Sequence, residues 1–184
     1  MIKLKYKNFI YLTDNEKLLV LEWRNSDRIR TKMVNQEIIR LENHLKWLEG
    51  LKQREDCKYF LFYVNDNLVG TFCYNDIDLL NKSCSCGSDI GNINFIGFGI
   101  ILNYYGFFNA FFNFDYSRIN ISVLKNNKRV YQLHKTFFYA IDDNNDENEY
   151  FLHYDKLSFN KNKNTIEDKI SKLYGDKIST EWIL

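Results

Sequence analysis

The sequence predicts an α+β domain, and three observations support this prediction. Residues 59–64 and 68–74 are two β-rich runs joined by Asn65-Asp66-Asn67, which is a hairpin signal. Residues 100–112 form an apolar stretch of helical length that follows a Gly-x-Gly. A β-type segment comes next, at 118–124, and an asparagine pair then opens another helix. Hairpin-paired strands interspersed with helices are typical of the α+β class.

The N-terminal part is predicted to contain one strand and two helices. Alternation of apolar residues with lysines over 2–6 indicates a half-exposed strand. Thr13, followed three residues later by Glu16, indicates the start of the first helix. The second helix is indicated by leucines at three- and four-residue spacing: Leu41, Leu45 and Leu48.

The later part of the chain is predicted to add strands around the central helices. A strand at 83–90 precedes the glycine loop. A short helix follows the asparagine pair. The runs 137–141 and 150–157 are then predicted to pair as a closing hairpin across an acidic turn at 142–149.

The last 25 residues differ in composition from the rest. From residue 160 the chain is rich in Lys and Asn, and a weak helical pattern spans 165–173. We therefore divide the chain into a domain at 1–158 and a polar, partly helical C-terminal extension at 159–184. The extension could enlarge the sheet, cover a neighbouring molecule or remain mobile.

Composition limits the classes of partner. The chain has 184 residues with 25 Lys and Arg against 24 Asp and Glu, a net charge of +1. Such a balance provides no bulk field for nucleic acid or for an acidic membrane, so we expect neither partner. Aromatic residues make up 17% of the chain, so large rings must fill much of the core. The N-terminus lacks a signal-peptide pattern, which predicts a cytoplasmic protein.

One segment is long enough to cross a membrane. Residues 93–112 carry no formal charge over 20 positions. Asparagines and glycines interrupt this stretch, and no positive-inside bias flanks it. We therefore expect a helix buried beneath the sheet.

The cysteines do not predict a disulfide scaffold or a metal site. Cys57, Cys73, Cys84 and Cys86 lack the Cys-x-x-Cys spacing of zinc sites, and the three histidines are scattered. Cys84 and Cys86 fall on one face of the predicted strand at 83–90, where small buried side chains are expected. We expect reduced thiols and no metal.

The glycine loop is the main candidate site. Gly97 and Gly99 precede the apolar helix, so the amide groups of residues 95–100 are expected to lie at its N-terminus. Unpaired N–H groups and the positive end of the helix dipole suit a pyrophosphate. Because a lone Gly-x-Gly occurs in many turns, the order of elements around it carries the prediction.

These elements resemble the GNAT N-acetyltransferases over residues 1–158. Within that superfamily, the chain is most similar to the enzymes that acetylate UDP-linked 4-amino-4,6-dideoxy sugars in pseudaminic acid biosynthesis. A related branch, the ribosomal-protein N-terminal acetyltransferases, shares the early Trp-Arg-Asn. The resemblance is carried by segments at 23–25, 44–48, 58–61, 68–70, 82–84, 97–99, 110–111 and 125–127.

The resemblance implies a central, mixed and mostly antiparallel sheet with helices on both faces and a V-shaped opening between strands 4 and 5. Acetyl-CoA would bind in this opening as co-substrate. Asn94 takes the place of the usual Gln or Arg in the phosphate loop, and Asn127 matches the asparagine that contacts the coenzyme arm, although it could simply be a helix N-cap. The implied coenzyme-binding residues are Ser88, Asp89, Ile90, Asn94, Phe95, Ile96, Gly97, Phe98, Gly99, Ile100 and Asn127.

The resemblance also implies a general acid and an acceptor site. The superfamily tyrosine that protonates the departing thiolate lies seven residues after the asparagine, which here is His134. His134 could donate a proton or could be a helix-surface histidine, and Tyr131 is a nearby alternative acid. The expected acceptor-site residues are Arg24, Asn25, His44 and Tyr74. Arg24 could instead be a helix C-terminal cation.

The leading functional prediction is therefore an N-acetyltransferase that acts on the amine of a nucleotide-linked 4-amino-dideoxy sugar and that could form a homodimer. One alternative is a protein N-terminal acetyltransferase, which would need a groove for an extended peptide. Another is a catalytically degenerate binding module, because positions 94, 134 and 138 all depart from the superfamily pattern.

Overall fold

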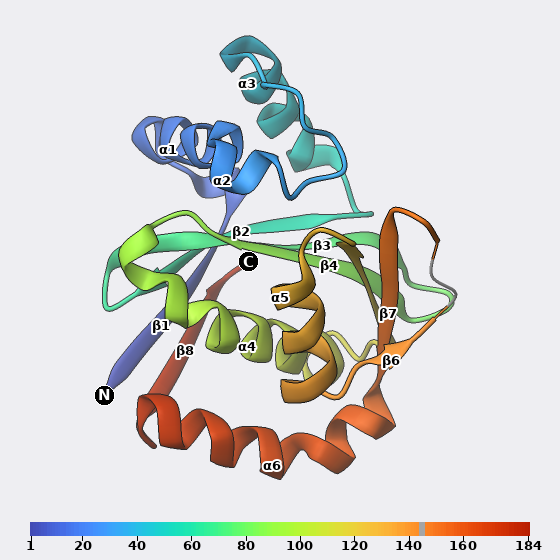
Figure 1. Ribbon diagram of the computed structural model, residues 1–184. Helices are drawn as coiled ribbons and strands as arrows, with labels where there is room; N and C mark the ends of the chain where they lie inside the picture. The colour runs from blue at the N-terminus through green and yellow to red at the C-terminus, as the bar shows by residue number, and fades with distance from the viewer. Residues whose placement is uncertain (144–145) are drawn as a thin grey trace.

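A computed structural model describes residues 1–143 and 146–184, which form an eight-stranded sheet with helices on both faces (Figure 1). The strand order is β6-β7-β5-β4-β3-β2-β1-β8, and the pairs are antiparallel except β4–β5 and β1–β8. The predicted α+β class and the mixed, mostly antiparallel sheet are confirmed. The strands are β1 (Ile2–Asn8), β2 (Lys58–Val64), β3 (Asn67–Asp78), β4 (Ser83–Ile90), β5 (Arg118–Leu124), β6 (Ile141–Asp142), β7 (Glu149–Asp155) and β8 (Ile178–Ile183).

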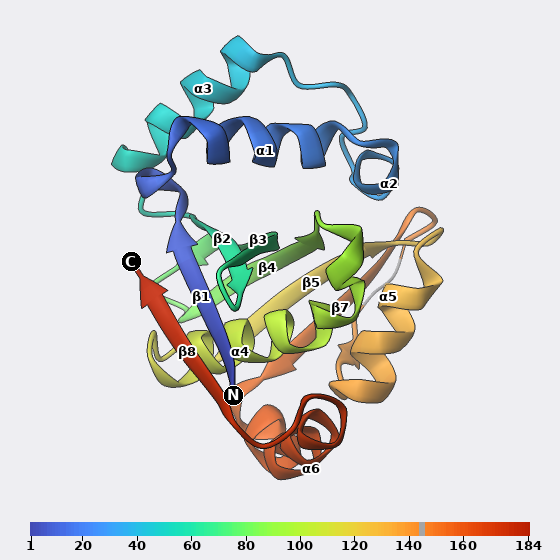
Figure 2. The same ribbon diagram turned by 90° about the vertical axis from the view of Figure 1, so that its left-hand side faces the viewer.

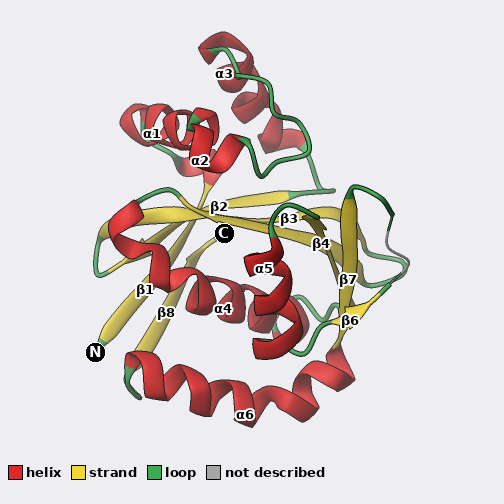
Figure 3. Cartoon of the chain, viewed as in Figure 1, coloured by secondary structure: helices red, strands yellow, loops and turns green. Residues whose placement is uncertain are grey.

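Figure 3 shows two helical layers, with α1, α2 and α3 on one face of the sheet and α4, α5 and α6 on the other. The helices are α1 (Asp14–Asn25), α2 (Asp27–Arg30), α3 (Leu41–Gly50), α4 (Gly99–Phe112), α5 (Lys128–Gln132) and α6 (Lys156–Tyr174). A 3-10 segment, Ile93–Phe98, precedes α4, and a π-helical turn, Leu133–Phe137, continues α5. Arg24, Asn25 and His44, predicted to bind the acceptor, therefore belong to the helices on one face of the sheet. The glycine loop, predicted to bind the coenzyme, leads into α4 on the other face.

The predicted capping box starts α1. The Glu16 carboxylate accepts a hydrogen bond from the Thr13 backbone N–H at 2.7 Å, and the Glu16 N–H donates to the Thr13 hydroxyl. The same carboxylate pairs with Lys7 of β1 at 2.7 Å and accepts from the Tyr63 hydroxyl of β2. These contacts tie α1 to the sheet at its N-terminal end.

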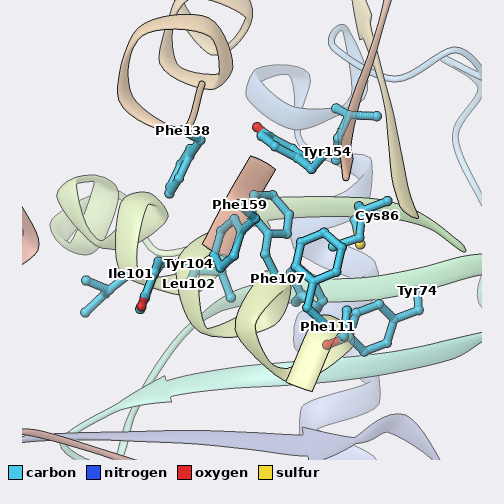
Figure 4. Packing of buried hydrophobic residues seen from close by; sticks show 14 of the residues in the cluster. Tyr74, Cys86, Ile101, Leu102, Tyr104, Phe107, Phe111, Phe138, Tyr154 and Phe159 are labelled. Atoms are coloured by element: carbon cyan, nitrogen blue, oxygen red, sulfur yellow. The ribbon is translucent and has the colours of Figure 1, made fainter. Parts of the chain in front are cut away.

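The main core is aromatic and lies between the sheet and α4, as Figure 4 shows. The Phe107 ring is 4.8 Å from the Tyr154 ring of β7, and Phe111 is 5.1 Å from Phe159 of α6. Gly106 permits this packing, because a Cβ there would overlap the Phe72 ring. The apolar segment at 93–112 passes a length and hydropathy test for a membrane span, with half of the tested window buried. In the structure its α4 part packs beneath the sheet.

The C-terminal extension joins this same sheet. α6 begins at Lys156, so the boundary predicted at 158 falls inside this helix. β8 then pairs in parallel with β1 over Ile2–Lys7, and Figure 2 shows the two strands side by side. Of the three possibilities left open for the extension, the structure shows the enlarged sheet.

The predicted closing hairpin is wrong in its first strand. The run at 137–141 was expected to be a strand, but the π-helical turn extends to Phe137 and only Ile141 belongs to β6. Phe138 and Ala140 are buried core residues in the intervening connection, so their apolarity reflects packing and not strand alternation. The second strand ends at Asp155, two residues earlier than expected. Part of the predicted acidic turn lies outside the described residues.

Candidate active site

β4 and β5 pair only at their amino-terminal ends in the described structure. Their parallel pairing covers Ser83 to Ser85 against Arg118 to Asn120. Beyond this point β4 continues beside β3, and β5 continues beside β7. The backbone of residues 86–90 therefore presents an edge towards the gap, and this edge could pair with an extended ligand. This split is the V-shaped opening predicted between strands 4 and 5.

The predicted phosphate loop connects β4 to α4 at the wide end of this split. Its 3-10 segment kinks at Phe95, whose φ and ψ are −114° and 19°. Asn92 fixes the loop to β3, since its N–H donates to Val69 O at 2.9 Å and its side chain donates to Leu68 O at 3.2 Å. The Asn92 side-chain oxygen also accepts from the Asn94 N–H at 3.1 Å.

Neither glycine of the loop is required by the fold itself. A Cβ at Gly97 would have no described atom within 4 Å, and one at Gly99 would meet only Ile90 Cγ1 at 3.7 Å. The positive φ angles that favour glycine occur elsewhere in the described chain. The two glycines thus leave a bare backbone surface where a ligand phosphate could approach closely.

A polar chain connects this loop to β4. The Ser88 hydroxyl donates to Asn103 Oδ1 at 3.0 Å, and Asn103 Nδ2 donates to the Gly99 carbonyl at 2.7 Å. Asn103 is buried within α4 and holds the start of that helix against the strand. Sequence reasoning treated Asn103 only as a break in an apolar run. Its position four residues after Gly99 was the available signal.

Asp89 is the one carboxylate on β4 in the predicted site. It is directly opposite Thr71 on β3, and the Thr71 hydroxyl donates to Asp89 Oδ2 at 2.5 Å. Asp89 Oδ1 is buried and has no hydrogen-bond partner in the described structure. Burial raises the pKa of Asp89 to about 6, against the opposing effects of Thr71, Arg28 and Arg24.

The Asp89 side chain lies on the face of β4 opposite to the side chains that face the core. Cys84 and Cys86 are buried in the α4-side core and Ser88 bonds to α4, so Asp89 lies on the opposite face, towards α1 and α2. The sequence analysis named Asp89 only as one of the implied coenzyme-binding residues. A lone acidic residue in a strand of small side chains was the missed signal.

The Trp-Arg-Asn segment at the end of α1 positions the chain above β4. The Trp23 ring lies against Gly91, where a Cβ would overlap it. Asn25 bonds in both directions with the Ile39 backbone at 2.9 Å. Arg24 Nη2 donates to Asn35 O at 2.6 Å, while Arg24 Nη1 is buried without a described partner. Asn25 therefore has a structural contact, and Arg24 keeps one donor available.

α2 and the turn that follows it carry further cations across the wide end of the split. Arg28 donates to the carbonyls of Ile90 and Gly91, each at 2.6 Å, at the end of β4. Lys32 contacts Asn126 at 3.4 Å, at the corner after β5. This segment therefore bridges the two strands and places positive charge above the gap.

Two residues predicted to bind the acceptor have structural contacts instead. The Tyr74 hydroxyl donates to Gly106 O at 2.7 Å in the core, and Tyr74 is fully buried on the α4 side (Figure 4). His44 is buried between α1 and α3, with its Nε2 3.0 Å from Lys17 O. Neither side chain has a free face for a sugar in this conformation.

His134 lies in the core beneath the sheet. Its Nδ1 is 2.6 Å from the Tyr154 hydroxyl, and its ring packs beside Phe107 and Phe138. Burial lowers the pKa of His134 to about 4, so the imidazole is neutral near pH 7. A neutral imidazole is a weak proton donor, so the geometry does not favour the acid role. The helix-surface alternative does not fit either.

Of the two remaining candidates, Tyr131 lies in α5 and Asn127 is the residue before it. The Tyr131 hydroxyl donates to Asp142 Oδ1 at 3.3 Å, and its ring stacks on Tyr150 with centroids 3.9 Å apart. Asn127 begins α5 without a side-chain cap bond among the described residues. Its main-chain N–H donates to Leu124 O at 2.8 Å, so the side-chain amide is the group available for a ligand.

Metal ligands do not cluster in the described part of the chain. Among these residues, three or more His, Cys, Asp or Glu side chains do not gather as metal ligands. A shallow groove lined by Asn81, Ser83, Arg118 and Lys156 lies at the amino-terminal ends of β4 and β5, away from the glycine loop.

Comparisons with known proteins agree with this geometry. No family model matches the chain. The chain is 29% identical over 140 residues to the acetyltransferase PseH of Campylobacter jejuni, which covers 76% of this chain and 87% of PseH. The crystal structure of C. jejuni PseH in complex with acetyl coenzyme A matches with a TM-score of 0.68 and 26% identity, covering 83% of this chain and 98% of that one. FdhC, described as a nucleotide-linked sugar GNAT, shares the fold with a TM-score of 0.70 and 21% identity, covering 84% and 89%.

A mixed sheet that splits between its fourth and fifth strands beside a glycine loop defines the GNAT class of acyltransferases. This chain has that fold, as the resemblance predicted. It is a GNAT-type N-acetyltransferase, and PseH is among the proteins to which it is similar.

Proposed function

We propose that this enzyme transfers the acetyl group of acetyl-CoA to the amine of a nucleotide-linked 4-amino-dideoxy sugar. The observation that carries the proposal is the split between β4 and β5. The glycine loop with its bare backbone lies at this split, and so does buried Asp89, whose Oδ1 has no hydrogen-bond partner in the described structure. The two features fall on opposite sides of one strand. A coenzyme and an amine acceptor could therefore meet at that strand from opposite faces of the sheet.

The coenzyme would occupy the α4 side and the edge of β4. Residues 86–90 offer backbone groups to an extended pantetheine arm, as in strand addition. The backbone of residues 96–100 and the N-terminus of α4 would hold the pyrophosphate, since the Phe95 N–H already donates to Asn92 O. The amide of Asn127 would contact the arm from the β5 side.

Asp89 is the proposed proton acceptor. The amine must be neutral to attack the thioester carbonyl, and its nitrogen loses a proton as the amide forms. A carboxylate with a pKa of about 6 is ionised at pH 7.5 and can accept that proton. The new C–N bond forms as the C–S bond breaks, and the thiolate leaves with a proton as coenzyme A. Tyr131 is the candidate donor of that proton, because the buried and neutral His134 is a weak one.

The cysteines favour direct transfer over an acyl-enzyme. Burial raises the pKa of Cys73 to about 12, and it raises the pKa of Cys86 well above the usual thiol value. Thiols in this state are poor nucleophiles at neutral pH. Cys73 and Cys86 are therefore poor carriers for an acetyl group, which fits direct transfer to the amine.

The cations of α1 and α2 support a nucleotide-linked acceptor. Arg24, Arg28, Arg30 and Lys32 occur within nine residues above the split, and Arg24 keeps a buried donor without a partner. A diphosphate could accept such charge-assisted hydrogen bonds. A peptide amine would offer no comparable anion.

An assay of thiol release from acetyl-CoA tests this proposal. We expect release that depends on a UDP-linked 4-amino-4,6-dideoxy sugar and is absent with peptides carrying free N-termini. Loss of the signal with the 4-hydroxy analogue would establish that the amine reacts. Release with the peptides alone would overturn the sugar assignment in favour of protein acetylation, and release with neither acceptor would favour a binding module.

A further inference from the structure

The C-terminal helix reaches the phosphate loop. Tyr174 is the last residue of α6, and its hydroxyl donates a hydrogen bond to the carbonyl of Gly97. Its ring also packs against Phe98, with centroids 5.5 Å apart. A residue from the extension thus contacts two adjacent residues of the loop proposed to hold the pyrophosphate.

This contact fixes a peptide plane. The carbonyl of Gly97 and the N–H of Phe98 belong to one planar trans peptide, so they point in opposite directions. Holding the carbonyl towards Tyr174 therefore turns the Phe98 N–H away from α6. Because glycine can adopt more backbone conformations than other residues, the peptide after Gly97 is weakly restrained by the chain itself. A hydrogen bond from another element therefore restricts its orientation more than it would at a residue with a side chain.

α6 is itself firmly attached to α4. The Tyr104 hydroxyl of α4 donates to Glu167 Oε1 at 2.6 Å, and the Tyr104 ring stacks on Phe159 with centroids 5.9 Å apart. The helix that begins at the phosphate loop and the helix that ends at Tyr174 are therefore joined by both a hydrogen bond and ring packing.

The chain beyond Tyr174 is also anchored. Gly175 has φ +83°, which turns the chain sharply after α6. β8 then pairs with β1 along six residues, and the Trp182 ring stacks on Tyr6 at 3.8 Å. Tyr174 is consequently held between two fixed elements and presents a defined donor to the loop.

We propose that residues 156–184 act as a brace for the coenzyme loop, with Tyr174 as a positioning residue that sets the orientation of the 97–98 peptide for coenzyme binding. This inference rests on the proposed coenzyme site. The match to the structure of C. jejuni PseH includes 98% of that chain but 83% of this one. This chain therefore has residues with no counterpart in the match. The brace would make coenzyme affinity depend on a segment that touches neither the thioester nor the acceptor.

Tyr174→Phe tests this proposal, because it removes the hydroxyl and keeps the ring. Loss of one hydrogen bond that preorganises the loop is expected to raise the Kd for acetyl-CoA about three- to tenfold. The Kd is measured by calorimetry, and kcat and the acceptor KM at saturating coenzyme should stay at their wild-type values. Tyr139→Phe is the matched control, because Tyr139 also contacts α6, through Lys169 Nζ at 3.0 Å, but does not contact the loop.

The outcomes separate the brace from the enzyme function. An unchanged Kd for acetyl-CoA in a folded Tyr174→Phe protein, or an equal change in Tyr139→Phe, would overturn the brace and leave the acetyltransferase intact. Failure of the wild-type chain to bind acetyl-CoA would overturn the proposed coenzyme site instead. A second variant covers the case in which Tyr174→Phe lowers the melting temperature. Tyr174→His keeps a ring with a hydrogen-bond donor, so it should recover part of the affinity for acetyl-CoA, and no recovery would overturn the brace.

Discussion

Replacing Gly97 with Asp is expected to weaken acetyl-CoA binding about 100-fold, which corresponds to roughly 2.7 kcal/mol. The new carboxylate would stand where the pyrophosphate is proposed to lie, and like charges a few ångströms apart in a partly desolvated site repel by about that much. The fold should be unaffected, because no described atom lies within 4 Å of the added Cβ. Calorimetric titration with acetyl-CoA measures the change.

Gly50→Asp is the matched control for this variant. Gly50 ends α3, on the other face of the sheet, and a Cβ there also meets no described atom within 4 Å. We expect its Kd for acetyl-CoA to equal the wild-type value. A Gly97→Asp protein that binds acetyl-CoA as tightly as Gly50→Asp does would remove the phosphate loop from the proposed site.

Replacing Asp89 with Asn is expected to lower kcat about 10²- to 10³-fold and to leave the Kd for acetyl-CoA unchanged. The amide keeps the shape and the contact with Thr71 but cannot accept the proton of the amine. In the wild type, kcat/KM should fall as pH drops below about 6, the pKa of Asp89, and this limb should vanish from the residual activity of the variant. Rapid-quench or thiol-release assays across pH 5–8 measure both effects.

The same substitution should stabilise the protein at high pH. The pKa of Asp89 is about 6 in the native state and about 3.9 in an unfolded chain, so the folded state favours the protonated form. The stability linked to this group is therefore fully present below pH 4 and is lost as pH rises through about 6. The Asp89→Asn protein escapes that loss and should be more stable than wild type by about 1–3 kcal/mol at pH 8, with no difference of this origin below pH 4. Denaturant unfolding at the two pH values measures the difference.

Asp66→Asn is the control for these two effects. Asp66 is an exposed carboxylate in the β2–β3 hairpin, and its side chain is 92% exposed. Its substitution should alter neither kcat nor stability measurably. Wild-type turnover in Asp89→Asn would exclude Asp89 as the proton acceptor, whatever happened to stability.

Local sequence patterns predicted the elements around the site well. The hairpin at Asn65-Asp66 is the expected tight turn, and both residues have the positive φ that this turn needs. The opening between β4 and β5 was implied by the family resemblance, whereas local patterns predicted the order of strand, glycine loop, helix and strand. Such signals depend on neighbours in the sequence, so they survive without any knowledge of the fold.

Side-chain roles were predicted less well, because they depend on strand faces and long-range contacts. Tyr74 alternates with Cys73, and which of the two faces the core is set by pairing with β2 and β4. The count of seven residues from Asn127 leads to His134, but the π-helical turn rotates that part of the helix and buries the ring against Tyr154. The role suggested for Asp89 depends on its burial, and its one side-chain hydrogen bond comes from Thr71, 18 residues earlier.

The C-terminal extension shows the same limit. Its polar composition gave only a weak helical pattern, whereas α6 spans Lys156–Tyr174. The buried residues of this helix are Phe159, Ile166 and Ile170. The pairing of β8 with β1 joins the two ends of the chain. A contact across nearly the whole sequence leaves no local signature.

Amide hydrogen exchange with and without acetyl-CoA tests the central claim most directly. The claim is that the coenzyme lies along the free edge of β4 with its pyrophosphate on the glycine loop. We predict that acetyl-CoA slows exchange at residues 86–90 and 94–100, while residues 41–50 of α3 stay unchanged. Protection confined to other segments, with these two exchanging as in the free protein, would contradict the claim.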